Sequence, residues 1–494
     1  MRNTRIVCTL GPASDSPEVL DRLIAAGLDC ARLNFSHGSH EGHARLAANV
    51  RAAAARAGRP VALLADLSGP KMRIGTFPGG PITLVPGAPF TLTPRAVAGD
   101  VSIVSMTYAP LSRDVHVGEA ILLDDGKLRL RVVSIGEGGE GREPGGLSNG
   151  ERAKGASGGP VGREPGGLSN DVHCVVEIGG VLSDRKGINV PGAALSARAL
   201  SEKDKDDLAF AVGEIGVELV ALSFVRRASD IREAQALSRG TPVIAKIEKP
   251  QAIDALDEIL DAADGAMVAR GDLGVELGPE KVPLLQKRII REVNRRGKLV
   301  ITATQMLDSM VSSPRPTRAE ASDVANAVLD GTDAVMLSNE TASGQYPVEA
   351  VQMMAAIIDE VERGAPAPEA PGLTGDWGFE NGAARAAALL SRTVGLAAIV
   401  VYTRDGRTAR LLSEYRPTCP ILALAPTAQV AQRLAIEWGV FPRLGGAPES
   451  PEALHADARE QALAAGFARA GDTLVVVAGF PRGVETNGVH LLRV

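Results

Sequence analysis

The chain contains 494 residues, of which 45% are apolar and 23% charged, and its formal net charge is −6 at pH 7. That length predicts about three domains in a globular protein of ordinary composition. The negative charge and an aromatic content of only 3% exclude a nucleic-acid binder that works by neutralising phosphates or by stacking bases.

The first residues, MRNTRIVCTLGPAS, lack the apolar core of a signal peptide, and no apolar run approaches the roughly 18 residues that cross a bilayer. The four cysteines, Cys8, Cys30, Cys174 and Cys419, form no CxxC pair, which is typical of a reducing cytosol. We therefore expect a cytoplasmic protein whose partners include neither a membrane nor a nucleic acid.

Eight short apolar runs predict β-strands; in chain order they are TRIVCTLG, DCARLNFS, PVALLADLSG, VELVALSFV, PVIAKIE, GAMVARGD, KLVITATQM and DAVMLSNET. Helical patterns such as SPEVLDRLIAAG and VPLLQKRIIREVNRRG lie between them, and several of these patterns stop at a glycine. Eight β–α units predict a (β/α)8 barrel, an α/β fold whose functional side chains lie at the carboxyl ends of the strands.

Two segments depart from this rhythm. Residues 74–185 contain short alternating strands and turns, which predict a small β-barrel domain inserted into a βα loop, where it would act as a lid. The (β/α)8 barrel is then expected at residues 1–73 and 186–363. After the linker GAPAPEAPG, a further βα pattern predicts a C-terminal α/β domain at residues 364–494.

The nonapeptide GREPGGLSN occurs twice inside the predicted lid, at residues 141–149 and 162–170. Residues 136–170 contain 13 glycines in 35 positions, so this segment cannot bury enough apolar surface to offset its ordering entropy. Two copies are also too few for a solenoid, which needs about three stacked units. We interpret the repeat as a tandem duplication in a hairpin loop, expected to be mobile and dispensable for chemistry.

Polar residues alternate with apolar ones in the second predicted strand, RLNFSHG. The strand period of two places Arg32, Asn34 and Ser36 on one face. A guanidinium, an amide and a hydroxyl at a barrel strand end suit a phosphate and a cation, whereas the alternative is a half-exposed strand end without function.

Lys246 and Glu248 of VIAKIEKP share a strand face, and Asp272 follows the next predicted strand. Two carboxylates from adjacent strands suit Mg²⁺ (or Mn²⁺), which prefers hard oxygen ligands. Lys246 would then supply a fixed positive charge near developing negative charge. The alternative is a structural network of salt bridges.

Two weaker patterns lie elsewhere on the predicted barrel rim. Thr302 and Thr304 alternate on the strand of LVITATQM, where threonine is often only a β-former. Lys71 and Arg73 stand where the inserted domain leaves the barrel, and Lys186 stands where it returns. Closure of a lid would bring these basic residues onto phosphates, while a solvated hinge is the alternative.

The C-terminal domain carries TRDGRT at residues 403–408, between a predicted strand and a helix. Backbone amides and hydroxyls at a helix N-terminus bind phosphate readily. An ordinary strand–helix turn is the alternative.

Blocks along nearly the whole chain resemble the pyruvate kinase family in family order; they include RIVCTLGPAS, ARLNFSHG, GPKMRIG, KGINVPG, SEKDKDDL, AKIEKP, MVARGDLGVE, TATQMLDSM and YTRDGRTARLLSEYRP. The resemblance implies a barrel, a β lid and an α/β domain, in an enzyme that uses Mg²⁺ to transfer phosphoryl from phosphoenolpyruvate to ADP, giving pyruvate and ATP. It also implies a homotetramer and a phosphorylated effector, bound at Thr403, Arg404, Asp405, Gly406, Arg407 and Thr408.

The resemblance further implies roles for single residues. Glu248 and Asp272 would ligate Mg²⁺, and Lys246 would stabilise the transferring phosphoryl group and the enolate. Thr304 would contact the substrate and is implicated in protonating the enolate carbon. The implied catalytic set is Lys246, Thr304, Arg32 and Arg73; the substrate contacts are Arg32, Lys246, Gly271, Asp272 and Thr304; the nucleotide contacts are Asn34, His37, Arg73 and Lys186.

Many members of this family need K⁺, held near Asn34, Ser36, Asp66 and the carbonyl of the next residue, here Leu67. Their pattern LDTKGPEIR reads ADLSGPKMR in this chain, so Lys71 takes the place of a glutamate. An ammonium about 4 Å from K⁺ would repel it by on the order of 4 kcal/mol at an effective dielectric of ~20. We expect Lys71 to replace K⁺; the alternative is a Lys71 that points to solvent while K⁺ still binds.

Two other function classes share part of this pattern. A Mg²⁺-dependent barrel lyase would need Glu248 and Asp272, but not Arg73 and Lys186 around a nucleotide. A non-catalytic effector-binding relative would be expected to have lost Lys246 or a metal ligand, and these residues are present.

Overall fold

Two units make up the computed structural model of this chain, which describes residues 2–136, 170–193, 196–366, 372–373, 378–446, 448–480 and 484–494. One unit combines Met1–Pro70 with Arg198–Val494, and the other is Lys71–Ala197. Within the described ranges, no helix is both long enough and apolar enough to span a membrane.

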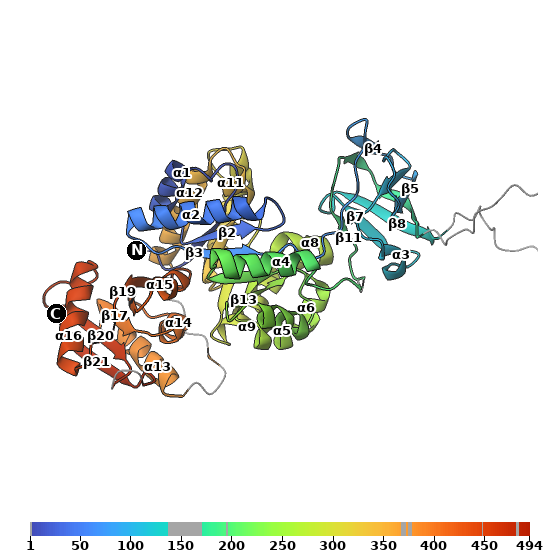
Figure 1. Ribbon diagram of the computed structural model, residues 1–494. Coiled ribbons are helices and arrows are strands. Elements are labelled where there is room, and N and C mark those ends of the chain that lie inside the picture. The colour runs from blue at the N-terminus through green and yellow to red at the C-terminus, as the bar shows by residue number, and fades with distance from the viewer. Residues whose placement is uncertain are drawn as a thin grey trace, which may run out of the picture. The chain divides into compact units, whose positions relative to one another are not determined.

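Eight parallel strands close into a barrel in the first unit (Figure 1). Their order around the barrel is β1-β16-β15-β14-β13-β12-β3-β2. The strands are β1 (Arg5–Thr9), β2 (Cys30–Asn34), β3 (Ala62–Asp66), β12 (Leu219–Leu222), β13 (Val243–Ile247), β14 (Gly265–Ala269), β15 (Leu299–Ala303) and β16 (Ala334–Leu337). Nearly all of their residues are buried, as expected for strands covered by helices outside and by side chains inside. The predicted (β/α)8 barrel is confirmed.

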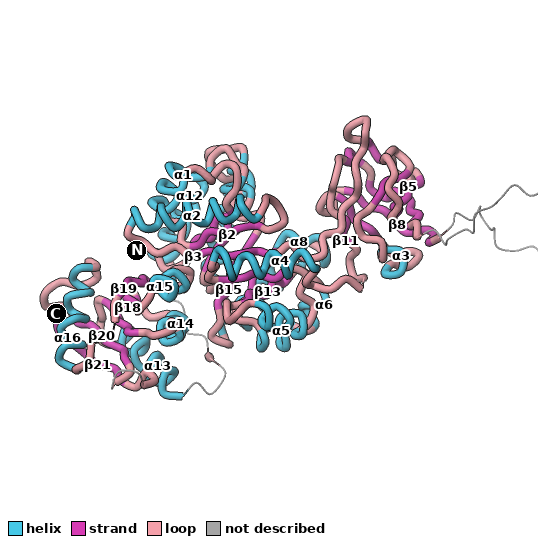
Figure 2. The backbone as a smooth tube through the Cα atoms, in the orientation of Figure 1, coloured by secondary structure: helices cyan, strands magenta, loops and turns pink. Residues whose placement is uncertain are grey.

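Helices connect these strands and cover the barrel (Figure 2). They are α1 (Pro17–Ala26), α2 (His40–Ala57), α4 (Glu202–Phe210), α5 (Ala228–Leu237), α6 (Pro250–Asp254), α7 (Leu256–Ala262), α8 (Arg270–Leu277), α9 (Val282–Asn294), α10 (Arg318–Leu329), α11 (Asn339–Ala342) and α12 (Pro347–Gly364). Local sequence sets their ends. The Ser39 side chain accepts a hydrogen bond from the Gly42 amide at the start of α2, and Gly58 ends that helix with φ +60°.

The inserted unit is built from short strands around its own core. Its six-stranded sheet has the order β11-β7-β8-β9-β5-β6, and β4 pairs with β10. The elements are β4 (Ile82–Leu84), β5 (Pro89–Thr93), β6 (Ile103–Ser105), α3 (Leu111–Asp114), β7 (Ala120–Leu123), β8 (Leu128–Ile135), β9 (Val172–Ile178), β10 (Gly180–Leu182) and β11 (Ile188–Asn189). The predicted β insertion is therefore present. The duplicated loop lies outside the described residues, apart from its ends.

A five-stranded sheet forms the C-terminal α/β domain, as the sequence predicts. Its strands are, in order, β19 (Val440–Leu444), β18 (Ile421–Ala425), β17 (Ala398–Tyr402), β20 (Thr473–Ala478) and β21 (Gly488–Arg493), of which only β21 is antiparallel to its neighbour. Helices α13 (Gly378–Thr393), α14 (Arg407–Glu414) and α15 (Ala428–Leu434) share one core, while α16 (Pro451–Ala464) packs in another.

Candidate active site

Barrel closure brings the ends of the first three strands together. Arg32 on β2 stands beside Thr9 on β1, and Asn34 stands opposite Asp66 on β3. The Arg32 guanidinium donates from Nε to Asp66 Oδ2 over 2.7 Å and from Nη1 to Thr9 Oγ1 over 2.7 Å. The guanidinium is therefore held in a fixed orientation at the rim of the barrel.

Lys246 on β13 lies at the centre of the charged groups. Its Nζ donates to Ser223 Oγ over 2.6 Å and lies 3.3 Å from Asp66 Oδ1 and 3.5 Å from Glu248 Oε2. Burial opposes the charged form, but the carboxylates of Asp66, Glu248 and Asp272 outweigh it and raise the pKa of Lys246. The ammonium therefore stays charged at neutral pH.

Asp66 balances two cations at once. Burial favours its neutral form, but Lys246 and Arg32 prevail and lower the pKa of this carboxyl. Sequence reasoning assigned Asp66 only to a monovalent cation site, and the structure adds that it joins Arg32 to Lys246. The same reasoning missed Ser223, which follows β12 and donates to the Leu67 carbonyl over 2.7 Å. Its place just after a barrel strand is the signal that could have found it.

Glu248 follows β13 and is held from one side. Its Oε1 accepts from the Phe224 amide over 2.7 Å, and Phe224 has a left-handed backbone with φ +59°. A non-glycine residue rarely adopts this backbone conformation. The backbone strain therefore lies at Phe224, the residue whose amide donates to the Glu248 carboxylate. Burial raises the pKa of Glu248, and the nearby charge of Asp272 raises it further, against the effect of Lys246.

Asp272 lies in the first turn of α8, directly after β14. The neighbouring Gly271 amide donates to Thr304 Oγ1 over 2.8 Å. Thr304 follows β15 with φ +69°, and its carbonyl accepts from Arg270 Nη2 over 2.8 Å. The structure thus brings Gly271, Asp272 and Thr304 to one part of the rim.

Thr302 and Thr304 do not share a strand face, contrary to the sequence prediction. Thr302 is buried and its hydroxyl donates to Thr332 Oγ1 over 2.9 Å. Thr304 lies beyond the strand, where its left-handed backbone breaks the period of two. The Thr304 hydroxyl instead accepts from the Gly271 amide.

Glu248 and Asp272 offer the oxygen ligands that a divalent cation would use. Within the described residues, no three His, Cys, Asp or Glu side chains gather closely enough to hold a metal by themselves. Two carboxylates with their remaining positions free for water and substrate oxygens fit Mg²⁺, which seldom takes an all-protein cage.

The loop after β2 carries the residues expected to meet nucleotide and K⁺. The Asn34 side-chain oxygen accepts from the Ser36 amide over 3.2 Å. Lys203 on α4 donates to the Phe35 carbonyl over 2.9 Å, and His43 Nε2 lies 2.9 Å from the His37 carbonyl oxygen. The loop is therefore tied to two helices through its backbone.

Lys71, Arg73 and Lys186 belong to the inserted unit, where Arg73 and Lys186 contact other residues of the same unit. Arg73 Nη1 donates to the Arg185 carbonyl over 2.8 Å, and Lys186 Nζ lies 2.7 Å from Asp124 Oδ1. Lys71 is exposed. The roles expected of these three residues at the barrel stay predictions.

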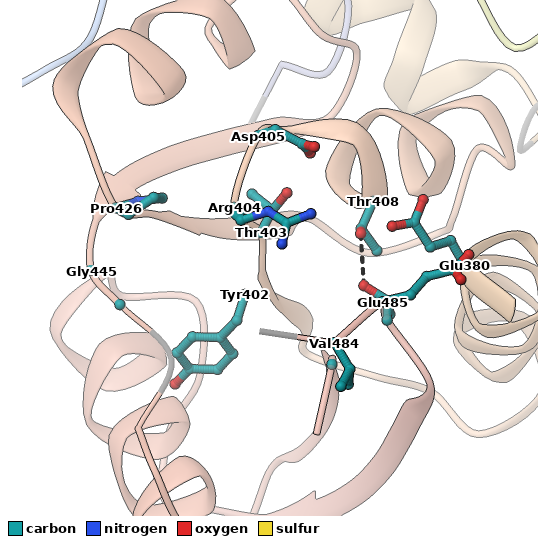
Figure 3. A pocket seen from close by; sticks show the side chains of 13 residues that line it. Glu380, Tyr402, Thr403, Arg404, Asp405, Thr408, Pro426, Gly445, Val484 and Glu485 are labelled. Carbon is teal, nitrogen blue, oxygen red and sulfur yellow. Dashed lines mark hydrogen bonds between the residues drawn. The ribbon is translucent and has the colours of Figure 1, made fainter. Parts of the chain in front are cut away.

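A pocket of about 220 Å³ opens in the C-terminal domain beside the TRDGRT turn (Figure 3). Of the predicted residues, Thr403, Arg404, Asp405 and Thr408 line it. Gly406, with φ +93°, precedes α14 instead. Arg407 Nε lies 3.0 Å from Glu380 Oε2.

Sequence reasoning missed several other residues of this pocket, among them Glu380 and Glu485, whose side chains Figure 3 shows beside Thr408. Burial raises the pKa of Glu380, Arg407 opposes this effect, and Glu485 adds to it. Their signal in the sequence is weak, because they come from α13 and from the segment before β21, far from TRDGRT along the chain.

Comparisons with known proteins agree on one family. Residues 1–143 and 166–351 match the family model "Pyruvate kinase, barrel domain", and residues 381–493 match "Pyruvate kinase, alpha/beta domain". Residues 144–165, which separate the two parts that the barrel model matches, fall inside the duplicated segment.

Curated relatives and a solved structure give the same result. A pyruvate kinase of Geobacillus stearothermophilus is 42% identical over all of this chain and 80% of its own length, and pyruvate kinase 2 of a Synechocystis species is 45% identical over 98% and 77%. The crystal structure of a pyruvate kinase from Cryptosporidium parvum is 33% identical, with a TM-score of 0.87 over 100% of this chain and 96% of that one.

Proposed function

This chain belongs to the pyruvate kinase family of phosphotransferases, and we propose that it transfers phosphoryl from phosphoenolpyruvate to ADP with the help of Mg²⁺ or Mn²⁺. The products would be pyruvate and ATP, at the last step of glycolysis. Phosphoryl transfer depends mainly on positioning of the substrates and on neutralisation of the phosphate charge. Arg32 and Lys246, held by hydrogen bonds at the barrel rim, are suited to both tasks.

The position of Lys246 is the observation that carries this proposal. Its ammonium is buried among Asp66, Glu248 and Ser223, where it stays charged, and its direction is fixed by a 2.6 Å hydrogen bond. A fixed cation in a site with little water stabilises charge that develops on a transferring phosphoryl group and on an enolate. Arg32, which is equally constrained, would bind the phosphate.

Glu248 and Asp272 would hold the divalent cation, which when bound neutralises phosphate charge and orients the substrate oxygens. The Phe224 amide holds the Glu248 carboxylate through its hydrogen bond to Oε1. Gly271 would contact the substrate through its backbone. Thr304, whose hydroxyl meets the Gly271 amide, is the candidate for protonating the enolate carbon.

Asn34, His37, Arg73 and Lys186 would bind the nucleotide, the last two from the inserted domain acting as a lid. Lys71 would replace K⁺ near Asn34, Ser36, Asp66 and Leu67, so that the enzyme works without that ion. Its charge differs by two units from that of the glutamate usual in the family, which supports this proposal.

The pocket of the C-terminal domain would bind a phosphorylated effector. It is lined by Thr403, Arg404, Asp405 and Thr408, so hydroxyls and a guanidinium are available to phosphate oxygens. We also propose a homotetramer in the cytoplasm, because the family commonly has that form.

Formation of pyruvate from phosphoenolpyruvate and ADP tests the proposal, with lactate dehydrogenase as the coupling enzyme. The parent protein should turn over with Mg²⁺, and Asp272→Asn should lose most activity at ordinary Mg²⁺ concentrations. A parent protein without turnover would overturn the proposal. A lyase would instead release pyruvate from an oxoacid without ADP.

A further inference from the structure

A buried ion pair lies close in the chain to the two candidate metal ligands, Glu248 and Asp272. Lys249 follows Glu248 in the chain, and its Nζ lies 2.6 Å from Glu276 Oε1. Both side chains are almost completely buried, at 7% and 2% exposure. Charges are rarely buried in this way, and removal of one partner leaves the other without compensation.

This pair joins the two elements that carry the candidate ligands. Lys249 lies just beyond β13, one residue from Glu248. Glu276 lies on α8, four residues and therefore about one turn after Asp272. A link between Lys249 and Glu276 thus fixes the end of β13 relative to α8, and with it the spacing of Glu248 and Asp272.

Lys249 also contacts the residue that holds Glu248. Its Nζ lies 4.9 Å from the centroid of the Phe224 ring, within reach of a cation–π interaction. The Phe224 amide donates to Glu248 Oε1, and Phe224 has a left-handed backbone. The ring in turn lies against Gly69, where an added Cβ would come within 2.4 Å of Phe224 Cδ2. Lys249 therefore braces Glu248 from the side of the ring as well.

The first two residues of helix α8 are held from the side of β15, where Arg270 Nη2 donates to the Thr304 carbonyl over 2.8 Å and the Gly271 amide donates to Thr304 Oγ1. The helix is eight residues long, and its N-cap residue, Ala269, makes no side-chain hydrogen bond to the first turn. A helix this short is only marginally stable alone, so tertiary contacts must set the position of both of its ends. The Lys249–Glu276 pair is such a contact, and it lies on the half of α8 away from Asp272.

We propose that Lys249 and Glu276 are positioning residues that set the distance between Glu248 and Asp272 and thereby the affinity for the divalent cation. This inference rests on the proposed function, in which those two carboxylates hold the metal. Groups that orient metal ligands commonly change metal affinity by about 10- to 100-fold when removed.

Binding of Mn²⁺ to the full-length protein, followed by its electron paramagnetic resonance signal, tests the inference without activity. Lys249→Met and Glu276→Gln should each weaken Mn²⁺ binding by about tenfold or more, and Lys249→Arg should restore much of the affinity. In steady-state kinetics, the KM for Mg²⁺ should rise more than kcat falls. Arg296→Met is the matched control. It removes ion pairs of 2.8 Å to Asp257 and Asp261, both on α7, and should leave Mn²⁺ binding unchanged.

Asp272→Asn separates failure of this inference from failure of the proposed function. If Asp272→Asn binds Mn²⁺ like the parent, the metal site itself is misplaced. If Asp272→Asn loses Mn²⁺ while folded Lys249→Met and Glu276→Gln bind it like the parent, the ion pair has no positioning role. Should Lys249→Met fail to fold, Glu276→Gln decides, since the amide keeps the shape of the side chain and removes only its charge.

Discussion

The barrel unit contains two buried charge clusters that differ in how far cations offset the burial of their carboxyls. The rim cluster consists of Arg32, Asp66, Lys246 and Glu248. The interface cluster consists of Asp333, Glu414, Arg416 and Glu437, where the barrel meets the C-terminal domain. In the first cluster, Lys246 and Arg32 outweigh the burial of Asp66, whereas in the second the nearby arginines do not outweigh the burial of Glu414 and Glu437.

The interface cluster has one strong ion pair beside two buried glutamates. Arg416 Nη2 lies 2.6 Å from Asp333 Oδ1, and the guanidinium stacks over the Trp438 ring at 4.9 Å. Both carboxylate oxygens of Glu414 and Oε2 of Glu437 have no hydrogen-bond partner among the described residues. Burial raises the pKa of Glu414 well above its usual value, and it raises that of Glu437 to about 7.

The difference shows what decides whether a buried group stays ionised. At the rim, Lys246 and Arg32 lower the pKa of Asp66, so charge persists where a phosphate would arrive. At the interface, burial outweighs the nearby arginines and raises the pKa of Asp333, Glu414 and Glu437. The contrast therefore lies between Asp66, whose pKa is lowered by two cations, and the two interface glutamates, whose pKa values are raised by burial.

The strongest test of this comparison is Lys246→Met. It should lower kcat by about 10³-fold or more, because the fixed cation at the transferring phosphoryl group is lost. Coupled pyruvate formation measures the effect. Lys205→Met removes an exposed pair with Glu202 and should keep parental activity. A Lys246→Met enzyme within tenfold of the parent would mean that Lys246 is structural.

Arg416→Met should cause the largest loss of stability. It leaves Asp333 buried without its cation, at a cost of about 3–5 kcal/mol in the free energy of unfolding. Thermal unfolding would show a clearly lower midpoint. Adding Asp333→Asn should recover part of the loss. Arg363→Met breaks an exposed pair with Glu360 and should change the midpoint little. Equal effects of the two arginines would contradict the comparison.

Glu437→Gln tests the protonated carboxyls directly. The folded-state pKa of Glu437 is about 7, above the usual 4.5, so the folded chain binds this proton more tightly than the unfolded chain. The stabilisation is present below about pH 4.5 and is lost as pH rises through 7, by on the order of 3 kcal/mol. Asp333, Arg416, Arg410 and Arg5 surround the group and set the size of this effect.

The parent protein should therefore lose stability between pH 5 and 8, while Glu437→Gln should show a flatter dependence in thermal unfolding over that range. Activity at the rim should not change. The exposed control Glu360→Gln should follow the parent. An unchanged pH slope in Glu437→Gln would show that this carboxyl is already ionised in the fold.

Lys71→Glu tests whether the rim needs a monovalent cation. The parent should differ by less than about twofold between sodium and potassium buffers, since an ammonium would repel K⁺ from the site. Lys71→Glu should become activated by potassium. Strong activation of the parent by potassium would instead show that Lys71 does not replace the ion.

The smallest effect is expected outside both clusters. Removal of residues 141–161 deletes one copy of the duplicated segment and should leave turnover within about twofold, because loop closure depends only weakly on loop length. The coupled assay at saturating substrates measures this. A collapse of activity would give the duplicated segment a role that its composition does not predict.

The sequence by itself determined the barrel strands, the β insertion, the C-terminal domain and most candidate rim residues. Strand periodicity and glycine stops report local structure, and the blocks around Lys246 and Asp272 are long enough to specify a family. Alternation failed at Thr302 and Thr304, since the strand ends between them and the backbone turns left-handed.

Only the tertiary structure decided which charges meet. Barrel closure places Asp66 between Arg32 and Lys246 and brings the Phe224 amide to Glu248. Docking of the C-terminal domain onto the barrel brings Asp333 to Arg416, 83 positions apart along the chain. Residue patterns cannot show these pairs, because ionisation depends on the distance and burial of partners that only the closed fold brings together.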